Sequence, residues 1–255
     1  MPVAEFSLAG KVAIVTGGSR GIGRSIAIGL AEHGADVAIA ARKPDALAET
    51  VAVLSKTGRR AIAVPTNVRH TDELRRLVDE TLRQLGRVDI LVNNAATSPA
   101  YGPVQEIDER AWDSLMDTNV KSAHILSNFA REAMLRHGDG GSIIHVSSIG
   151  GFLASEVIGG YSISKAALVM LAQVQAKTWG RDGIRVNCIA PGLIQTEFSR
   201  ALWENPKFLE STLRTTALQR IATPDEMAGA VVFFASRASS FVTGQTLILD
   251  GGRRL

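Results

Sequence analysis

Short apolar runs alternate along the chain with segments in which apolar residues recur every three or four positions. The run at 12–16, Val-Ala-Ile-Val-Thr, is rich in β-branched residues, and such a run is typical of a strand that is buried on both faces. Similar runs predict further strands at 37–41, 61–64, 88–92, 142–147, 185–190 and 246–249. Helical spacing predicts helices at 22–33, from the turn after 41 through 54, and at 72–85, 111–136, 162–179 and 225–235.

The order of these elements indicates the fold. Alternation of strand and helix favours a parallel sheet with helices on both faces. Right-handed crossovers then give a doubly wound (Rossmann) α/β sheet of about seven strands, whose ligand crevice lies outside the carboxyl ends of the strands. Gly34, Gly58 and Gly86 stand where helix C-caps are needed, and Thr223 precedes Pro-Asp-Glu as an N-cap. No repeat or linker interrupts residues 1–255, so we expect one domain.

Composition and charge exclude several classes of protein. Of the 255 residues, 45% are hydrophobic and 21% are charged, which is typical of a packed globular protein. The longest apolar stretches, such as 227–235, are too short to span a bilayer, and Glu5 precedes any basic residue, unlike a secretory signal. The single cysteine, Cys188, fits a reducing compartment. We therefore expect a cytoplasmic protein that binds no membrane.

The basic residues form no recognisable nucleic-acid site. The net charge of +3 comes mostly from arginines scattered over the whole chain, without a dense basic tract. No spacing of cysteines and histidines matches a zinc site. The sequence therefore predicts neither nucleic-acid binding nor a metal.

A glycine-rich segment, Thr-Gly-Gly-Ser-Arg-Gly-Ile-Gly at 16–23, joins the first predicted strand to the first predicted helix. Glycine permits a tight turn and lets a pyrophosphate approach the backbone, while the helix N-terminus supplies unpaired N–H donors. A merely tight turn is the alternative. We expect the dinucleotide to contact Gly17, Ser19, Arg20, Gly21, Ile22 and Gly23.

Two other motifs overlap this segment. Residues 17–21 match the G-x-S-x-G elbow of serine hydrolases, but only one strand precedes Ser19, and the elbow needs an oxyanion loop from an earlier strand. Residues 18–25 resemble a Walker loop, yet Arg24 stands in place of the phosphate-binding lysine. Both interpretations are disfavoured.

The end of the second predicted strand bears on the choice of cofactor. An NAD site carries a carboxylate about twenty residues after the glycines, whereas Arg42 and Lys43 stand there. Asp36 lies at the other end of the strand and Asp45 lies beyond the turn. Arg42, with Arg20, is able to pair with a 2′-phosphate, so NADP(H) is favoured and NAD(H) remains possible.

Tyr161 immediately precedes the predicted helix at 162–179, and Lys165 lies in its first turn. Tyr161 and Lys165 are four residues apart, which places both side chains on one face of a helix. A nearby ammonium stabilises a phenolate and lowers the tyrosine pKa from its ordinary value of about 10, which suits acid–base catalysis. Ser148 lies thirteen residues earlier, just past a strand, where its hydroxyl is able to bind a substrate oxygen. Alone, this pattern is weak, because Y-x-x-x-K occurs by chance in many helices.

Taken together in this order, the motifs resemble the short-chain dehydrogenase/reductase family, and the resemblance extends over essentially the whole chain. The matching segments are Thr-Gly-x-x-x-Gly-x-Gly at 16–23, Asn-Asn-Ala-Ala at 93–96, Asn119, Ser148, Tyr161 with Lys165, Pro-Gly at 191–192, Gly-Gln at 244–245 and Asp-Gly-Gly at 250–252.

The resemblance implies roles for individual residues. Tyr161 would be the acid/base, Lys165 would hold the nicotinamide ribose and lower the tyrosine pKa, and Ser148 would polarise the substrate oxygen. Asn119 would kink its helix and anchor a water that leads protons from Lys165 to bulk solvent. Further cofactor contacts are implied for Asn67, Val68, Asn94, Ala95, Ala96, Pro191, Gly192, Ile194 and Thr196.

Two positions depart from the family pattern. Ala96 replaces the last glycine of Asn-Asn-Ala-Gly, and Asn67 replaces the aspartate that holds the adenine amino group. The amide oxygen of Asn67 still accepts a hydrogen bond, so adenine binding should survive. His145 and Cys188 lie within predicted strands, and we expect both to be core residues rather than catalysts.

By the same resemblance, three segments surround the substrate: 97–103, 150–160 and a mobile lid at about 193–215. Their large residues favour a ketone, aldehyde or dicarbonyl with apolar substituents, and Arg200 leaves room for some polarity. The run 190–203 is similar to the branch of NADPH-dependent carbonyl (dicarbonyl/retinal) reductases. The large residues of the three segments are Tyr101, Phe152, Leu153, Val157, Ile158, Ile194, Phe198, Leu202 and Trp203.

The prediction is therefore an enzyme that transfers hydride between NADP(H) and a small-molecule carbonyl or alcohol. An NAD-dependent secondary-alcohol dehydrogenase and a non-catalytic NADP(H)-binding sensor are the alternatives. Helices at 111–136 and 162–179 carry more apolar surface than one sheet face requires, and the family pairs these helices across a dimer. We expect a homotetramer.

Overall fold

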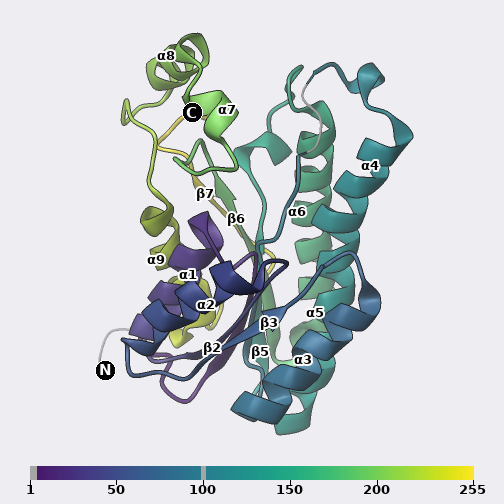
Figure 1. Cartoon of the computed structure of the whole chain (residues 1–255), viewed down its shortest axis with the longest axis vertical. Coiled ribbons are helices and arrows are strands. Elements are labelled where there is room, and N and C mark those ends of the chain that lie inside the picture. Colours follow the sequence, from purple (N-terminus) through teal and green to yellow (C-terminus); the bar gives the residue numbers. More distant parts are fainter. Residues whose placement is uncertain (1–4, 99–101) are drawn as a thin grey trace.

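The computed structural model describes residues 5–98 and 102–255, and its centre is one sheet of seven parallel strands (Figure 1). The strands follow the order β3-β2-β1-β4-β5-β6-β7, which confirms the predicted doubly wound sheet. The bounds are β1 Val12–Thr16, β2 Asp36–Ala41, β3 Ala61–Pro65, β4 Ile90–Asn93, β5 Gly141–Val146, β6 Ile184–Pro191 and β7 Thr246–Leu249.

Helices cover both faces of the sheet, as Figure 1 shows. On one face lie α1 Gly21–Glu32, α2 Pro44–Ser55 and α9 Ala228–Ala235. On the other lie α3 Thr71–Leu85, α4 Glu109–Met116, α5 Ser122–His137 and α6 Gly159–Trp179. Two short helices, α7 Arg200–Trp203 and α8 Pro206–Thr215, stand together beyond one end of the sheet. The sequence pattern did not predict α7 and α8.

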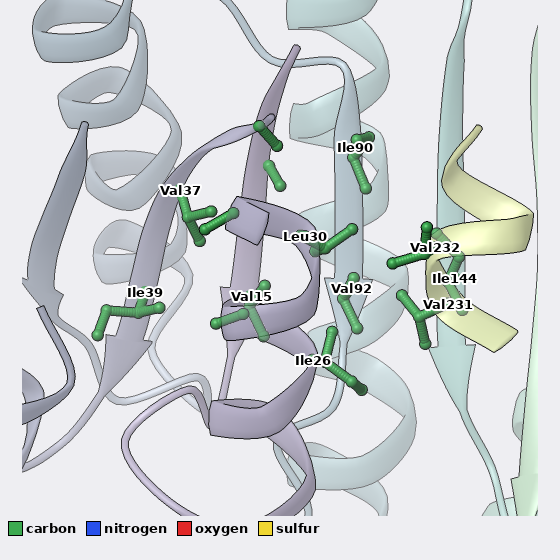
Figure 2. Packing of buried hydrophobic residues seen from close by; sticks show 14 of the residues in the cluster. Val15, Ile26, Leu30, Val37, Ile39, Ile90, Val92, Ile144, Val231 and Val232 are labelled. Atoms are coloured by element: carbon green, nitrogen blue, oxygen red, sulfur yellow. The ribbon is translucent and has the colours of Figure 1, made fainter. Parts of the chain in front are cut away.

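Successive side chains of a strand pack into two separate cores, because side chains alternate between the faces of a sheet. Val15 packs in the core under α1 and α9, whereas Ile14 packs in the core under α3, α5 and α6. Figure 2 shows Ile26 and Leu30 of α1 in the first of these cores, close to Val15 and other strand residues. Both faces are therefore buried, which explains why the strands read as continuous apolar runs rather than alternating ones.

One predicted helix is interrupted. Helical periodicity predicted one helix at 111–136, with a kink at Asn119 implied by the resemblance. A π-helical turn, Asp117–Lys121, contains Asn119 and separates α4 from α5. The caps agree better with expectation: Gly86 ends α3 in the left-handed conformation at φ 92°, and Thr223 forms a capping box with Glu226.

The direction in which successive strands are added to the sheet reverses beside β1, which is the topological switch point of the sheet. This strand pairs with β2 on one side and with β4 on the other, so the chain crosses over in opposite directions from the middle of the sheet. The connections after β1 and β4 diverge there and leave a crevice at the carboxyl ends of the strands. Within the described ranges, no helix has the length and apolar character to cross a lipid bilayer.

Candidate active site

A cavity of about 850 Å³ opens at the carboxyl ends of the strands. The segments that line it follow β1, β2, β3, β4, β5 and β6, together with the start of α6 and parts of α7 and α8. Ser148 is among the lining residues, whereas Asn119 is not. The predicted cofactor residues all line it: Gly17, Ser19, Arg20, Gly21, Ile22, Gly23, Arg42, Lys43, Asn67, Val68, Asn94, Ala95, Ala96, Tyr161, Lys165, Pro191, Gly192, Ile194 and Thr196.

The glycine-rich turn has a conformation that larger residues would not tolerate. Gly17 and Gly21 have φ angles of 66° and 53°, in the left-handed region that favours glycine. A Cβ on Gly17 would lie 2.6 Å from Nδ2 of Asn94, and a Cβ on Gly23 would overlap the carbonyl oxygen of Gly17. Arg20 precedes α1 without a side-chain cap, so the first N–H groups of α1 are available to an anion.

Asn94 ties the end of β4 to this turn. Its Nδ2 donates hydrogen bonds to the carbonyl oxygens of Thr16 at 2.9 Å and Gly17 at 3.3 Å. The hydroxyl of Thr16 in turn accepts from the backbone N–H groups of Asn94 at 3.0 Å and Ala95 at 3.1 Å. Asn94 and Thr16 therefore hold the end of β4 against the glycine-rich turn, and Thr16 was not among the predicted site residues.

Four cationic side chains line the cavity after the ends of β1, β2 and β3. Arg20, Arg42, Lys43 and Arg69 line it there, and none of Arg20, Arg42 and Lys43 forms an ion pair within the described residues. Asp36 lies at the opposite end of β2, where both Arg59 and Arg60 bind it at 2.7 Å. The structure therefore places cations, and not Asp36, at the end of β2 that faces the cavity.

Asn67 stands at the place expected for adenine, but its amide oxygen has a local partner. Oδ1 accepts from the backbone N–H of Arg69 at 3.2 Å, and the backbone N–H of Asn67 donates to Glu73 at 2.7 Å. A second lone pair of Oδ1 remains for an amino group. The replacement of aspartate by asparagine therefore preserves an acceptor at this position.

Tyr161 and Lys165 lie one turn apart on α6, and both line the cavity. The Nζ atom of Lys165 is 5.4 Å from the centroid of the Tyr161 ring and donates to the carbonyl oxygen of Val146 at 2.7 Å. The lysine is 2% exposed, and burial lowers its pKa to about 8. It therefore carries a positive charge at neutral pH, next to the phenol. The ring of Phe198 lies 6.0 Å from that of Tyr161, centroid to centroid.

The two serines after β5 have different surroundings. Ser147 is buried, and its hydroxyl donates to the carbonyl oxygen of Lys165 at 2.8 Å. Ser148 is half-buried, lines the cavity, and accepts from the N–H of Gly150 at 3.1 Å. The hydroxyl hydrogen of Ser148 is thus left for a substrate oxygen.

Asn119 lies in the π-helical turn and is not among the residues that line the cavity. Its side chain is 1% exposed and bridges both backbone polar groups of Thr97, accepting at 2.8 Å and donating at 3.0 Å. Its Nδ2 also lies 2.9 Å from the hydroxyl of Ser164 on α6. The asparagine therefore joins the loop after β4 to α6.

His145 and Cys188 belong to the interior. His145 is fully buried, with Asn93 at 3.2 Å from Nδ1 and Gln175 at 2.9 Å from Nε2. Burial lowers the pKa of His145 to about 4, so the imidazole is neutral in the folded protein. Burial raises the pKa of the Cys188 thiol to about 12. Neither residue lines the cavity, in agreement with the expected core positions.

The substrate segments meet the cavity only in part. Phe152, Val157 and Trp203 are not among the lining residues, and the indole of Trp203 donates to the carbonyl oxygen of Thr196 at 2.8 Å. Tyr101 lies outside the described residues. The expected residues that do line the cavity are Leu153, Ile158, Ile194, Phe198 and Leu202.

Sequence reasoning missed Phe208 and Arg253, which also line the cavity. Asn205 followed by Pro206 was a signal for α8, because asparagine caps helices and proline suits the first turn. Nothing in the sequence around Arg253 predicts that this residue lies near α8. No cluster of three or more histidine, cysteine, aspartate or glutamate residues suited to a metal occurs in the part of the chain that the structure describes.

The chain is similar to known oxidoreductases over almost its whole length. A family model described as Enoyl-(Acyl carrier protein) reductase matches residues 17–254. Dehydrogenase/reductase SDR family member 4 of Bos taurus is 40% identical over 242 residues, which cover 95% of this chain and 86% of the bovine protein. Short chain dehydrogenase/reductase astE of Aspergillus oryzae is 37% identical over 254 residues, 98% of this chain and 97% of that protein.

Solved structures agree closely with the fold. A gluconate 5-dehydrogenase from Burkholderia cenocepacia J2315, in complex with NADP and tartrate, superposes with a TM-score of 0.93 at 35% identity and covers 98% of both chains. A 7α-hydroxysteroid dehydrogenase complexed with NADH and 7-oxo glycochenodeoxycholic acid gives a TM-score of 0.93 at 34% identity, covering 97% of this chain and 96% of that one.

Proposed function

The chain belongs to the short-chain dehydrogenase/reductase family, and on this premise we propose that it is an NADP(H)-dependent carbonyl reductase. The family establishes an oxidoreductase that uses a nicotinamide cofactor, and the proposal concerns the cofactor preference, the substrate class and the residue roles. The observation that carries it is the placement of Tyr161, Lys165 and Ser148 in one cavity with the glycine-rich turn.

The residues that line the cavity suit the successive parts of a dinucleotide. The N–H groups at the start of α1 and the glycines suit a pyrophosphate, Asn67 and Val68 suit the adenine, and Lys165 suits the nicotinamide ribose. Arg42 and Arg20 suit a 2′-phosphate. The bound nicotinamide supplies or accepts the hydride.

Side chains of α6 and of the loop after β5 transfer the proton and stabilise the charge that forms on the substrate oxygen. Tyr161 donates its phenolic proton to the substrate oxygen during reduction, and the Lys165 ammonium stabilises the phenolate that remains. The Ser148 hydroxyl donates a hydrogen bond to the same oxygen as its negative charge grows. Asn119 holds the loop after β4 in place through Thr97, and it anchors a water that leads protons from Lys165 to bulk solvent.

The cofactor preference depends on the cations after β2. Relatives of known structure bind NADP in one case and NADH in another, so an NAD-dependent secondary-alcohol dehydrogenase is the alternative within the family. Arg42→Ala is expected to raise the KM for NADPH roughly ten- to hundred-fold and to change that for NADH little, because one charge-assisted contact is lost. Lys56→Ala, an exposed cation at the end of α2, is the control. Equal effects on both cofactors would contradict the preference for NADP(H).

The substrate end of the cavity suits apolar substituents beside the carbonyl. Leu153, Ile158, Phe198 and Leu202 line it, in agreement with a reductase of ketones, aldehydes or dicarbonyls. The segment 193–215, which contains α7 and α8, is proposed as the substrate lid. The carbonyl (dicarbonyl/retinal) reductase branch of the family remains our proposal for this chain.

Exposed apolar side chains on α6 support the proposed homotetramer. Ile163, Met170 and Val174 are 44%, 59% and 54% exposed, and such a row on one helix suits burial against a second copy. Light scattering after size-exclusion chromatography tests this, and a monomer at micromolar concentration would refute it. The free, buried Cys188 fits the proposed cytoplasmic location.

The reaction is tested by following NADPH and NADH absorbance over a panel of ketones, aldehydes and diketones. Tyr161→Phe should lower turnover by roughly a thousand-fold or more while cofactor binding, measured by fluorescence, persists. Ser19→Ala should keep some activity. Full activity of the tyrosine variant would disprove the mechanism, and cofactor binding by the wild-type protein without turnover of any substrate would favour the sensor alternative.

A further inference from the structure

After β7 the chain turns sharply back over the lid. Gly251 and Gly252 have φ angles of 65° and 82°, so two successive residues take the left-handed conformation. A Cβ on Gly251 would lie 2.9 Å from Cγ2 of Thr216, and one on Gly252 would lie 2.8 Å from Cβ of Ala217. The turn is therefore packed tightly against the residues that follow α8.

The carboxylate of Asp250 fixes the same turn. One oxygen accepts from the backbone N–H of Gly252 at 2.9 Å, and the other accepts from the backbone N–H of Arg254 at 2.9 Å. Both oxygens are thus bound by the backbone, and the side chain of Arg253, between these two residues, is directed by a rigid turn.

Arg253 is half-buried and lines the cavity that contains Tyr161 and Ser148. Its guanidinium carbon lies 6.0 Å from the centroid of the Phe208 ring on α8. Burial lowers the pKa of Arg253, and the charge of Asp250 opposes that shift only in part. The guanidinium remains charged, although it has lost part of its water shell.

Asp250 raises the pKa of Arg253 through its charge, but no carboxylate of the described residues forms an ion pair with this cation. Glu197, an acidic residue of the cavity wall, lies 3.6 Å from Arg200. The other arginines that line the cavity, Arg20, Arg42 and Arg69, follow β1, β2 and β3. Arg253 instead follows β7 and contacts Phe208 of the segment proposed as the lid, a position that suits the substrate better than the cofactor ribose.

From this placement we propose that Arg253 binds a carboxylate of the substrate, so that the enzyme reduces oxo acids with an otherwise apolar body. The inference deepens the proposed function and rests on it. A guanidinium binds a carboxylate through two parallel hydrogen bonds. Phe208 next to Arg253, and Leu202 and Phe198 in the same cavity wall, suit the carbon skeleton between the carboxylate and the carbonyl.

The test compares phenyl-substituted oxo acids with their methyl esters, which keep the shape and lose the charge. The probes are 2-oxo-4-phenylbutanoate, 4-oxo-4-phenylbutanoate and 5-oxo-5-phenylpentanoate, each with its ester, in assays with NADPH. For at least one chain length the wild-type kcat/KM should be about ten-fold or more higher for the acid than for the ester. The difference should appear mainly in KM, because the contact is made before the chemical step.

Arg253→Gln should lower kcat/KM for the acid to the value for its ester. It should leave kcat/KM for the ester and the KM for NADPH unchanged. Arg253→Lys should restore part of the preference. Arg254→Gln is the matched control, because this neighbouring guanidinium lies 4.5 Å from the Phe152 ring centroid, outside the cavity wall; it should keep the full preference.

The outcomes separate the two proposals. Equal turnover of acids and esters by the wild-type protein would overturn the role of Arg253 and leave the carbonyl reductase intact. An acid preference that survives in Arg253→Gln would also overturn that role. An increase in the KM for NADPH in this variant, equal for all substrates, would assign Arg253 to the cofactor and overturn the inference. Absence of turnover with every carbonyl and both cofactors would refute the proposed function itself.

Discussion

The hydroxyl of Ser147 donates a hydrogen bond to the carbonyl oxygen of Lys165 at 2.8 Å. The Lys165 ammonium in turn donates to the carbonyl oxygen of Val146 at 2.7 Å. Two contacts of opposite direction thus fasten the start of α6 to the end of β5, where Ser148 faces the cavity. The adjacent serines thus have different surroundings: Ser147 binds the backbone of Lys165, and Ser148 lines the cavity, where we propose that it binds the substrate.

This difference predicts opposite outcomes for two alanine variants. Ser148→Ala should lower kcat/KM by roughly a hundred-fold or more, because a donor to the developing oxyanion is lost, and should change the thermal midpoint little. Ser147→Ala should destabilise the protein by about 1 kcal/mol, because a buried hydrogen bond is lost, and retain most of its activity. Steady-state kinetics and thermal unfolding check both. The reverse pattern would show that Ser147 is the substrate-binding serine.

The pKa of Lys165 predicts the alkaline limb of the pH profile. Since burial lowers this pKa to about 8, the ammonium is present below that pH and is lost above it. Reduction should therefore decline as the pH rises through about 8, because the phenolate then has no cation beside it.

Lys165→Met is the matched control, because it keeps the size of the side chain and removes the charge. Its rate should be lower by roughly a hundred-fold, and its profile should lack the limb near pH 8. A wild-type profile that stays level from about pH 7 to about pH 10 would contradict this role for the lysine.

His145 predicts a loss of stability in acid. Burial lowers its pKa from 6.5 to about 4, so the unfolded chain binds a proton below pH 6.5 that the folded protein binds only below about 4. The stability contributed by the neutral imidazole is present above pH 6.5 and is lost as the pH falls toward 4, by about 2 kcal/mol at pH 5. Denaturant unfolding at neutral pH and near pH 5 measures it. His145→Gln, which cannot titrate, should show a correspondingly smaller difference between the two conditions, and an unchanged difference would exclude His145 as the cause.

A pair of glycines tests the cofactor turn. In Gly23→Ala the new Cβ would overlap the carbonyl oxygen of Gly17 and Nδ2 of Asn94, so the turn must shift and cofactor affinity should fall by roughly ten-fold or more. Gly229→Ala on α9 is the control, because its Cβ would meet nothing within 4 Å and alanine favours a helix. Fluorescence titration with NADPH compares them. Equal affinities would indicate that the turn does not bind the pyrophosphate.

The features that the sequence predicted depend on residues that are close together in the chain. The buried strands were predicted because all residues of a run such as Val12–Thr16 are buried, and the glycine-rich turn because a Cβ on Gly17 or Gly23 would collide with its neighbours. The family resemblance implied a kink at Asn119, but helical periodicity alone did not predict the interruption of the helix at 111–136. It accompanies the binding of Asn119 to Thr97 and Ser164, residues 22 and 45 positions away, and no helical periodicity records such contacts.

The substrate end was the least predictable part. Helix α8 is amphipathic and short, and its position over the cavity depends on contacts with a turn that follows β7. Arg253 reaches Phe208 only because Gly251 and Gly252 turn the chain back. Such tertiary placement depends on residues about forty positions apart, so the sequence around either residue carries no trace of it.

The position of β1 in the sheet also has a consequence for how the chain is made. Strands β1, β2 and β3 pair in succession near the start of the chain, but the second edge of β1 meets β4 only at Ile90. During synthesis this apolar edge stays unpaired until the fourth strand emerges, and an unpaired edge invites pairing with another nascent chain. Early release of a truncated chain is therefore expected to yield aggregates rather than a smaller folded unit.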